Sequence, residues 1–192
     1  EEVRAESLRS FMAVRPNRTE TWVFAYGSLI WDPCFAYVER RPATLNGYRR
    51  AFNIWTALAR GTPENPGLGL GLEVGGKECR GVAYRMDPVH EQDGLKALWR
   101  REMFTGVYRP LWLTVDAVGK PVDAIVFVVV PGHPQYAGDL ACEAAAEIIA
   151  RASGERGPCR DYLARTYHAL AEVGIDDDEL KDLLAQVDAC AG

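Results

Sequence analysis

The chain has 192 residues, 48% of them hydrophobic, and a formal net charge of −5 at pH 7. This length and hydrophobic content suffice for one domain with a sizeable core. The acidic balance argues against a nucleic-acid partner, which would need a basic face, and the absence of any apolar run of roughly 20 residues argues against a membrane-spanning helix or a membrane partner.

The cysteines and histidines indicate neither a disulfide framework nor a metal site. The five cysteines are widely spaced without a CxxC pair, and the three histidines show no metal-ligand spacing. This pattern is typical of a reduced, cytosolic protein. The spacing of the cysteines and histidines leads us to expect no metal site. The N-terminus also lacks the charged and then apolar segments of a secretory signal, so we expect a cytoplasmic protein.

The N-terminal part of the chain predicts an arm followed by a buried strand. Residues 1–20 are charged, with apolar residues at helical spacing, and they predict a short helix or arm that packs loosely and ends before Pro16. Residues 22–26 are apolar and aromatic, which is typical of a short buried strand. We expect residues 21–192 to form a single domain, because no repeat or linker divides them.

The middle of the chain predicts strands joined by tight turns. Leucines alternate with glycines over residues 68–74, which predicts a strand with small residues on one face. Gly75-Gly76 then predicts the turn of a hairpin, and Gly119-Lys120 predicts a second one. The expected strands in this part are residues 43–55, 68–74, 80–86, 108–118 and 122–130.

Helices are expected after the strands and once between them. Asp87-Pro88 predicts the start of a helix, interrupted or delayed by Gly94, that carries Leu98, Trp99 and Glu102 and stops before Gly106. Strands followed by helices are typical of an α+β domain. The C-terminal helices are expected over residues 139–153, ending at Gly154, over 158–173, and over 176–189, the last one capped by Asp176.

The strand at residues 22–26 leads into a turn, Tyr26-Gly27-Ser28-Leu29. A glycine directly after a strand lets another group come close, and successive backbone N–H groups in such a turn can converge on an anion or a developing oxyanion. An ordinary turn out of a core strand explains the same residues. Ser28 is a poor candidate nucleophile, because it has no GxSxG motif and no histidine nearby in sequence.

Glu102 differs from most acidic residues of the chain, because apolar side chains surround it in sequence and a glycine follows the helix end. A carboxyl group in an apolar pocket has its pKa raised from about 4.3 towards about 6–7, the range that suits a general acid/base. The alternative is an ordinary salt bridge at the helix end, with Arg100 or Arg101 as its partner.

Several segments together resemble one known family, and they occur in its order over roughly residues 22–180. They are Phe24-Ala25-Tyr26-Gly27-Ser28-Leu29-Ile30-Trp31, Arg60-Gly61-Thr62-Pro63-Glu64-Asn65-Pro66-Gly67, Gly81-Val82-Ala83-Tyr84-Arg85, Arg101-Glu102 with Gly106-Val107-Tyr108, Tyr136-Ala137-Gly138, and Asp161-Tyr162-Leu163. On these segments the chain resembles the ChaC family of glutathione-specific γ-glutamylcyclotransferases. The first 20 residues lie outside the resemblance.

The resemblance implies an α+β fold, a small mixed β-barrel with helices packed around it. It also implies an enzyme that converts glutathione to 5-oxoproline and Cys-Gly without a cofactor, by attack of the substrate's α-amine on its own γ-carbonyl. Glu102 would be the general acid/base. The residues implied in substrate binding are Tyr26, Gly27, Ser28 and Leu29 in the turn, with Tyr108 and Tyr162 as candidates for the wall of the site.

Two alternatives stay open at this point. The turn would contact only the γ-glutamyl end of a substrate, so other γ-glutamyl amino acids or γ-glutamylamines could replace glutathione. The same scaffold could also serve as a non-catalytic binding module. Glu102 argues against a pure binding module, because such a protein has no need of a carboxyl group among apolar residues.

Overall fold

The structure is a computed structural model that describes residues 1–16 and 19–190. It contains two compact units. The first comprises Glu1–Arg49 and Leu72–Val130, and the second comprises Arg50–Gly71 and Pro131–Gly192. Among the described residues, no helix has both the length and the apolar character that crossing a membrane requires.

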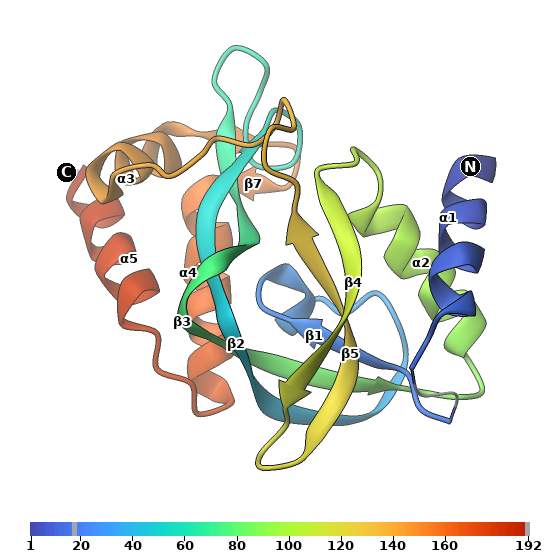
Figure 1. Cartoon of the computed structure of the whole chain (residues 1–192). Coiled ribbons are helices and arrows are strands. Elements are labelled where there is room, and N and C mark those ends of the chain that lie inside the picture. The colour runs from blue at the N-terminus through green and yellow to red at the C-terminus, as the bar shows by residue number, and fades with distance from the viewer. Residues whose placement is uncertain (17–18, 191–192) are drawn as a thin grey trace. The chain divides into compact units, whose positions relative to one another are not determined.

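Five strands close into a barrel in the order β1-β3-β2-β4-β5 (Figure 1). The strands are β1 (Trp22–Ala25), β2 (Tyr37–Thr56), β3 (Gly67–Met86), β4 (Tyr108–Asp116) and β5 (Pro121–Val129). Strand β1 is antiparallel to β3 and parallel to β5, so the barrel is mixed. The α+β class with a small mixed barrel, which the resemblance implies, is therefore confirmed.

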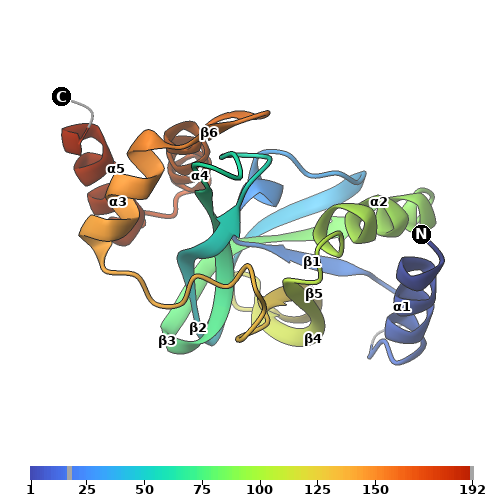
Figure 2. The ribbon, with the colours of Figure 1, turned by 90° about the horizontal axis from the view of Figure 1, so that it is seen from above.

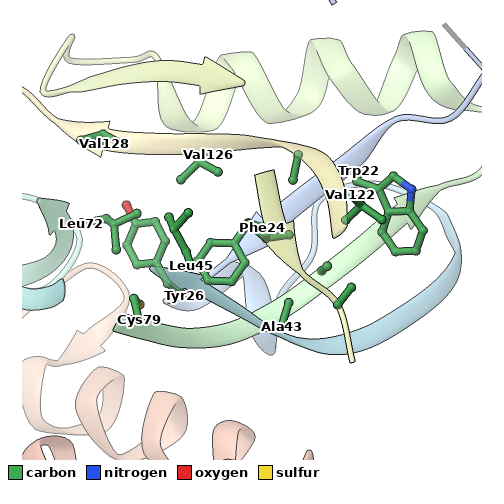
Figure 3. Packing of buried hydrophobic residues seen from close by; sticks show 14 residues of the cluster. Trp22, Phe24, Tyr26, Ala43, Leu45, Leu72, Cys79, Val122, Val126 and Val128 are labelled. Carbon is green, nitrogen blue, oxygen red and sulfur yellow. The ribbon is translucent and has the colours of Figure 1, made fainter. Parts of the chain in front are cut away.

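The core of the first unit fills this barrel. All four residues of β1 are buried, which explains why its sequence is apolar throughout rather than alternating. Trp22, Phe24 and Tyr26 stand two residues apart, and Figure 3 shows their side chains within one buried cluster. The rest of the cluster consists of Ala43, Leu45, Leu72, Cys79, Ala83, Val115, Ala117, Val122, Ala124, Val126 and Val128.

The predicted hairpin at Gly75-Gly76 is wrong. Strand β3 continues from Gly67 to Met86 without reversing, and both glycines lie inside it at φ of 124° and 77°. Two glycines permit a local bend of a long strand as readily as a chain reversal, and sequence alone does not separate the two. The second predicted hairpin is confirmed, because β4 and β5 pair antiparallel out to Asp116↔Pro121.

Two helices complete the first unit, α1 (Glu2–Ala13) and α2 (Glu91–Glu102), which lie side by side (Figures 1 and 2). No residue of α1 is fully buried, yet the ring of Phe11 stacks on that of Trp112 with 4.9 Å between centroids. The predicted N-terminal helix is thus confirmed, and aromatic contacts hold it.

Helix α2 starts later than predicted. Asp87 does not cap it, because the Asp87 Oδ1 accepts a hydrogen bond of 2.9 Å from the backbone N–H of Val89, within the turn that precedes the helix. The helix itself begins at Glu91.

The second unit contains α3 (Cys142–Arg151), α4 (Cys159–Glu172) and α5 (Asp178–Cys190), with short strands β6 (Ser153–Gly154) and β7 (Gly157–Pro158) between the first two. The three predicted helices are confirmed, but two of their ends differ. Gly154 lies in β6 instead of ending α3, and the side chain that accepts the N–H of Leu180 in the first turn of α5 belongs to Asp177, one residue after the predicted cap.

Candidate active site

The turn after β1 uses the carbonyl groups of Gly27 and Ser28 for its own hydrogen bonds, while the backbone N–H groups of Gly27, Ser28 and Leu29 have no acceptor within the described residues. A short 3₁₀ helix, η1 (Ser28–Ile30), forms there, with the N–H of Ile30 bonded to the Gly27 carbonyl at 2.9 Å and the N–H of Asp32 to the Ser28 carbonyl at 2.9 Å. Within residues 1–16 and 19–190, no hydrogen bond uses the N–H of Gly27, Ser28 or Leu29 as donor. Three successive amides are therefore available to an external acceptor.

The side chains of the turn divide into buried anchors and one polar contact. Tyr26 and Leu29 are each only 7% exposed, and the Tyr26 hydroxyl donates a 2.7 Å hydrogen bond to the carbonyl of Phe127 in β5. Ser28 is half-buried, and its Oγ accepts a 2.8 Å hydrogen bond from Nη2 of Arg101. The buried side chains of Tyr26 and Leu29 thus fix the turn on the barrel, and Ser28 supplies its polar contact with Arg101.

Glu102 is the last residue of α2, and its side chain is only 14% exposed. Burial raises the pKa of this carboxyl group from 4.5 to about 6, against the opposing effect of the Arg101 charge, whose Nε lies 3.2 Å from Oε1. The apolar environment and the salt bridge, two alternatives at the level of sequence, therefore occur together.

Arg101 connects the turn to this carboxyl group. Its Nη2 contacts Ser28 and its Nε contacts Glu102, while Nη1 donates to the backbone carbonyl of Asp32 at 2.7 Å. The turn and Glu102 are thus both within reach of one planar guanidinium. Sequence reasoning missed this link, because Arg101 and Ser28 stand 73 positions apart and only the adjacency of Arg101 and Glu102 was visible.

The two remaining predicted site residues have different surroundings. Tyr108 begins β4 in the first unit, and its ring lies 6.4 Å from that of Phe127, the residue whose carbonyl binds Tyr26. Tyr162 lies in α4 of the second unit, with its ring edge-on to Phe52 at 5.8 Å and under the guanidinium of Arg60 at 5.7 Å. The substrate-binding roles of both tyrosines stay predictions.

Two further features bear on where a ligand could lie. A groove of about 540 Å³ runs between α1 and α2, lined by Leu8, Met12 and Trp99 among others, but Glu102 and the turn do not line it.

In the described part of the chain, no group of three or more His, Cys, Asp or Glu side chains is arranged to hold a metal ion.

The sequence of the whole chain has known relatives. The family model described as ChaC-like protein matches residues 21–190. The chain belongs to the ChaC-like family. It is 42% identical over 187 residues to the glutathione-specific γ-glutamylcyclotransferase of Escherichia coli, covering 97% of this chain and 80% of the relative. It is also 36% identical to γ-glutamylcyclotransferase 2-3 of Arabidopsis thaliana, covering 86% and 87% of the two chains.

A solved structure supports the same ChaC-like fold. The crystal structure of a yeast γ-glutamyl cyclotransferase specific to glutathione superposes with a TM-score of 0.80 and 24% identity, covering 89% of this chain and 96% of that one. At this level of identity the comparison concerns the fold alone. It agrees with the closed five-stranded barrel of the ChaC-like chain.

Proposed function

We propose that this ChaC-like protein is a glutathione-specific γ-glutamylcyclotransferase, which converts glutathione to 5-oxoproline and Cys-Gly. The proposal rests on one observation above all: a partly buried carboxyl group, Glu102, and a turn with unused amides meet on the guanidinium of Arg101. The names of the bacterial and plant relatives support the same activity.

The reaction needs a proton acceptor and a proton donor but no co-reactant. The α-amine of the γ-glutamyl group attacks its own γ-carbonyl, forms the C–N bond of a five-membered ring, and expels the cysteinyl nitrogen as an amine. The attacking nitrogen loses one proton and the leaving nitrogen gains one. A carboxyl group with a pKa of about 6 can accept the first proton near neutral pH and return it, so Glu102 is assigned both steps.

The turn is assigned the γ-glutamyl end of the substrate. The amides of Gly27, Ser28 and Leu29 can donate to the α-carboxylate or to the γ-carbonyl oxygen as negative charge develops on it. Since the Ser28 Oγ accepts its hydrogen bond from Arg101, its own O–H is left to donate to the same anion. Holding the chain folded for intramolecular attack can lower the barrier by about 7–11 kcal/mol.

The backbone of Tyr26 is assigned to binding of the γ-glutamyl end, together with the rest of the turn. Tyr108 and Tyr162 are assigned to binding of the Cys-Gly half and to the exclusion of water. Residues 21–192 are proposed to form the single catalytic domain, preceded by the N-terminal arm. We place the protein in the cytoplasm, a location supported by its five cysteines, all of them free thiols.

The test is a mass-spectrometric search for 5-oxoproline after incubation of the purified protein with reduced glutathione. The same assay with γ-glutamyl-alanine compares kcat/KM for the two substrates. Release of 5-oxoproline with a higher kcat/KM for glutathione supports the proposal. A preference for γ-glutamyl-alanine would move the activity to other γ-glutamyl compounds, and glutathione binding without turnover would make the protein a binding module.

A further inference from the structure

We propose that Arg101 is the positioning residue of this site. Through one guanidinium it holds the substrate-binding turn, by way of Ser28, and the acid/base Glu102 at a fixed separation. The inference rests on the proposed function for the roles of the two groups. It concerns a residue that makes no assigned contact with the substrate and acts through its neighbours.

Arg101 contacts three different residues around the site. Arg101 donates from Nη1 to Asp32, both to its carbonyl at 2.7 Å and to its Oδ2 at 3.2 Å, and from Nη2 to Ser28 at 2.8 Å. Its Nε faces Glu102 at 3.2 Å. All three guanidinium nitrogens are thus engaged, on three different partners. Because the guanidinium is planar and rigid, fixing one edge on Asp32 fixes the direction of the others.

Burial distinguishes this arrangement from an ordinary surface salt bridge. The Arg101 side chain is 19% exposed and that of Glu102 is 14% exposed, whereas Asp32, the outer partner, is 53% exposed. Exposed ion pairs contribute little to stability because solvent screens them and two flexible side chains must be ordered. The contact between Arg101 and Glu102 is largely shielded from solvent, so the Arg101 charge lowers the pKa of Glu102, against the larger opposing effect of burial.

The charge of Glu102 is coupled to the titratable groups Arg101 and Cys34. From its own helix, the Arg101 charge lowers the pKa of Glu102 and partly offsets the effect of burial. From the segment after η1 comes Cys34, whose thiol experiences the charges of Arg101, Glu102 and Asp32 and whose pKa is raised by burial, so it stays neutral near pH 7. Without Arg101, burial would act on Glu102 unopposed.

The experiment uses three single variants of the full chain. Arg101→Met removes both the positive charge and the planar set of N–H donors. Arg101→Lys keeps a positive charge but loses the planar set of donors. Arg100→Met is the matched control, because Arg100 is the exposed neighbour on the same helix. Each variant is assayed for kcat and KM with glutathione across pH, and the Glu102 carboxyl is titrated by ¹³C NMR without substrate, its signal assigned with Glu102→Gln.

The two substitutions of Arg101 separate charge from geometry. In Arg101→Met we expect the Glu102 pKa to rise above the wild-type value and kcat/KM to fall by about tenfold or more, since small misplacements of a catalytic group are costly. In Arg101→Lys we expect a titration close to wild type but the same loss of rate. Arg100→Met should leave both unchanged.

Other outcomes would overturn the inference. It fails if the Glu102 titration does not move in Arg101→Met, or if Arg101→Lys restores wild-type kcat/KM. If Arg101→Met does not fold, the kcat/KM of Arg101→Lys with glutathione decides whether the geometry of Arg101 matters. A wild-type protein that releases no 5-oxoproline would refute the proposed function instead, and the substrate-free titration would still decide whether Arg101 controls the carboxyl group.

Discussion

The hydroxyl of Tyr26, which follows β1, donates a buried 2.7 Å hydrogen bond to the backbone carbonyl of Phe127 in β5. Strand β1 pairs with β5 at Trp22↔Ala124 and Val23↔Ile125, so Phe127 lies two residues beyond this register. Where the ladder between the two strands ends, a side chain therefore supplies the donor. The bond ties the residue that precedes the unused amides to the barrel wall.

We predict that Tyr26→Phe lowers the free energy of unfolding by about 1–3 kcal/mol, because it leaves a buried carbonyl without this donor. Chemical denaturation of the variant and the wild type measures the difference. The variant loses the anchor of the turn but keeps Glu102 unchanged, so we expect KM for glutathione to change more than kcat. An unchanged free energy of unfolding would mean that the Tyr26 hydroxyl does not anchor the turn.

Replacing Glu102 with Gln should abolish turnover without unfolding the protein. The amide has the shape of the carboxyl group but cannot carry a proton, and positioned acid/base catalysis contributes about 10²–10⁴-fold to a rate. The release of 5-oxoproline is measured together with a thermal melt. Asp93→Asn on the same helix, where the side chain is 85% exposed, is the matched control and should retain full activity. Near-normal activity of Glu102→Gln would remove Glu102 from the mechanism.

The close approach of β3 to β1 gives a third prediction. A Cβ on Gly81 would lie 2.3 Å from the Ala25 carbonyl oxygen and about 3 Å from the Phe24 ring, so Gly81→Ala must displace backbone or core. We expect a loss of at least about 1–3 kcal/mol in the free energy of unfolding. Gly69→Ala is the control, because its Cβ would meet nothing nearer than 3.8 Å. Equal stability of the two variants would contradict the predicted clash.

How far the sequence predicts this fold depends on the range of each interaction. The buried strand at β1 and the helix that carries Glu102 follow from local patterns of apolar residues, and both are present. The closure of the barrel depends on pairings between strands far apart in the chain, so the family resemblance implies it and periodicity does not. Gly75-Gly76 shows that a local pattern cannot always distinguish a turn from a bent strand, because φ values that favour glycine occur in both.

The same distinction applies to the candidate site. The apolar neighbours of Glu102 predict its burial, which the structure bears out at 14% exposure of the side chain. No local pattern connects Arg101 with Ser28, because their contact forms only when the helix packs beside the turn. The pKa of Glu102 depends on that non-local packing as well as on its neighbours, and it could not be worked out from spacing alone.

The raised pKa of Glu102 also predicts how stability depends on pH. Its folded-state value of about 6 lies above the ordinary 4.5, so between these pH values the folded state binds more protons than the unfolded state. The contribution of this group to stability is then fully present below pH 4.5 and is lost as pH rises through about 6. One pKa unit corresponds to about 1.4 kcal/mol, which makes the full effect about 2 kcal/mol.

Glu102→Gln cannot ionise and should escape this loss. We expect the free energy of unfolding of the variant, relative to wild type, to increase by about 2 kcal/mol between pH 4 and pH 7, with most of the change between pH 4.5 and about 6. Denaturant titrations of both proteins across this range measure the difference, in which the other carboxyl groups cancel. Asp93→Asn should give a flat difference because solvent screens that side chain. A flat difference for Glu102→Gln as well would show that burial does not favour the protonated form of this carboxyl group.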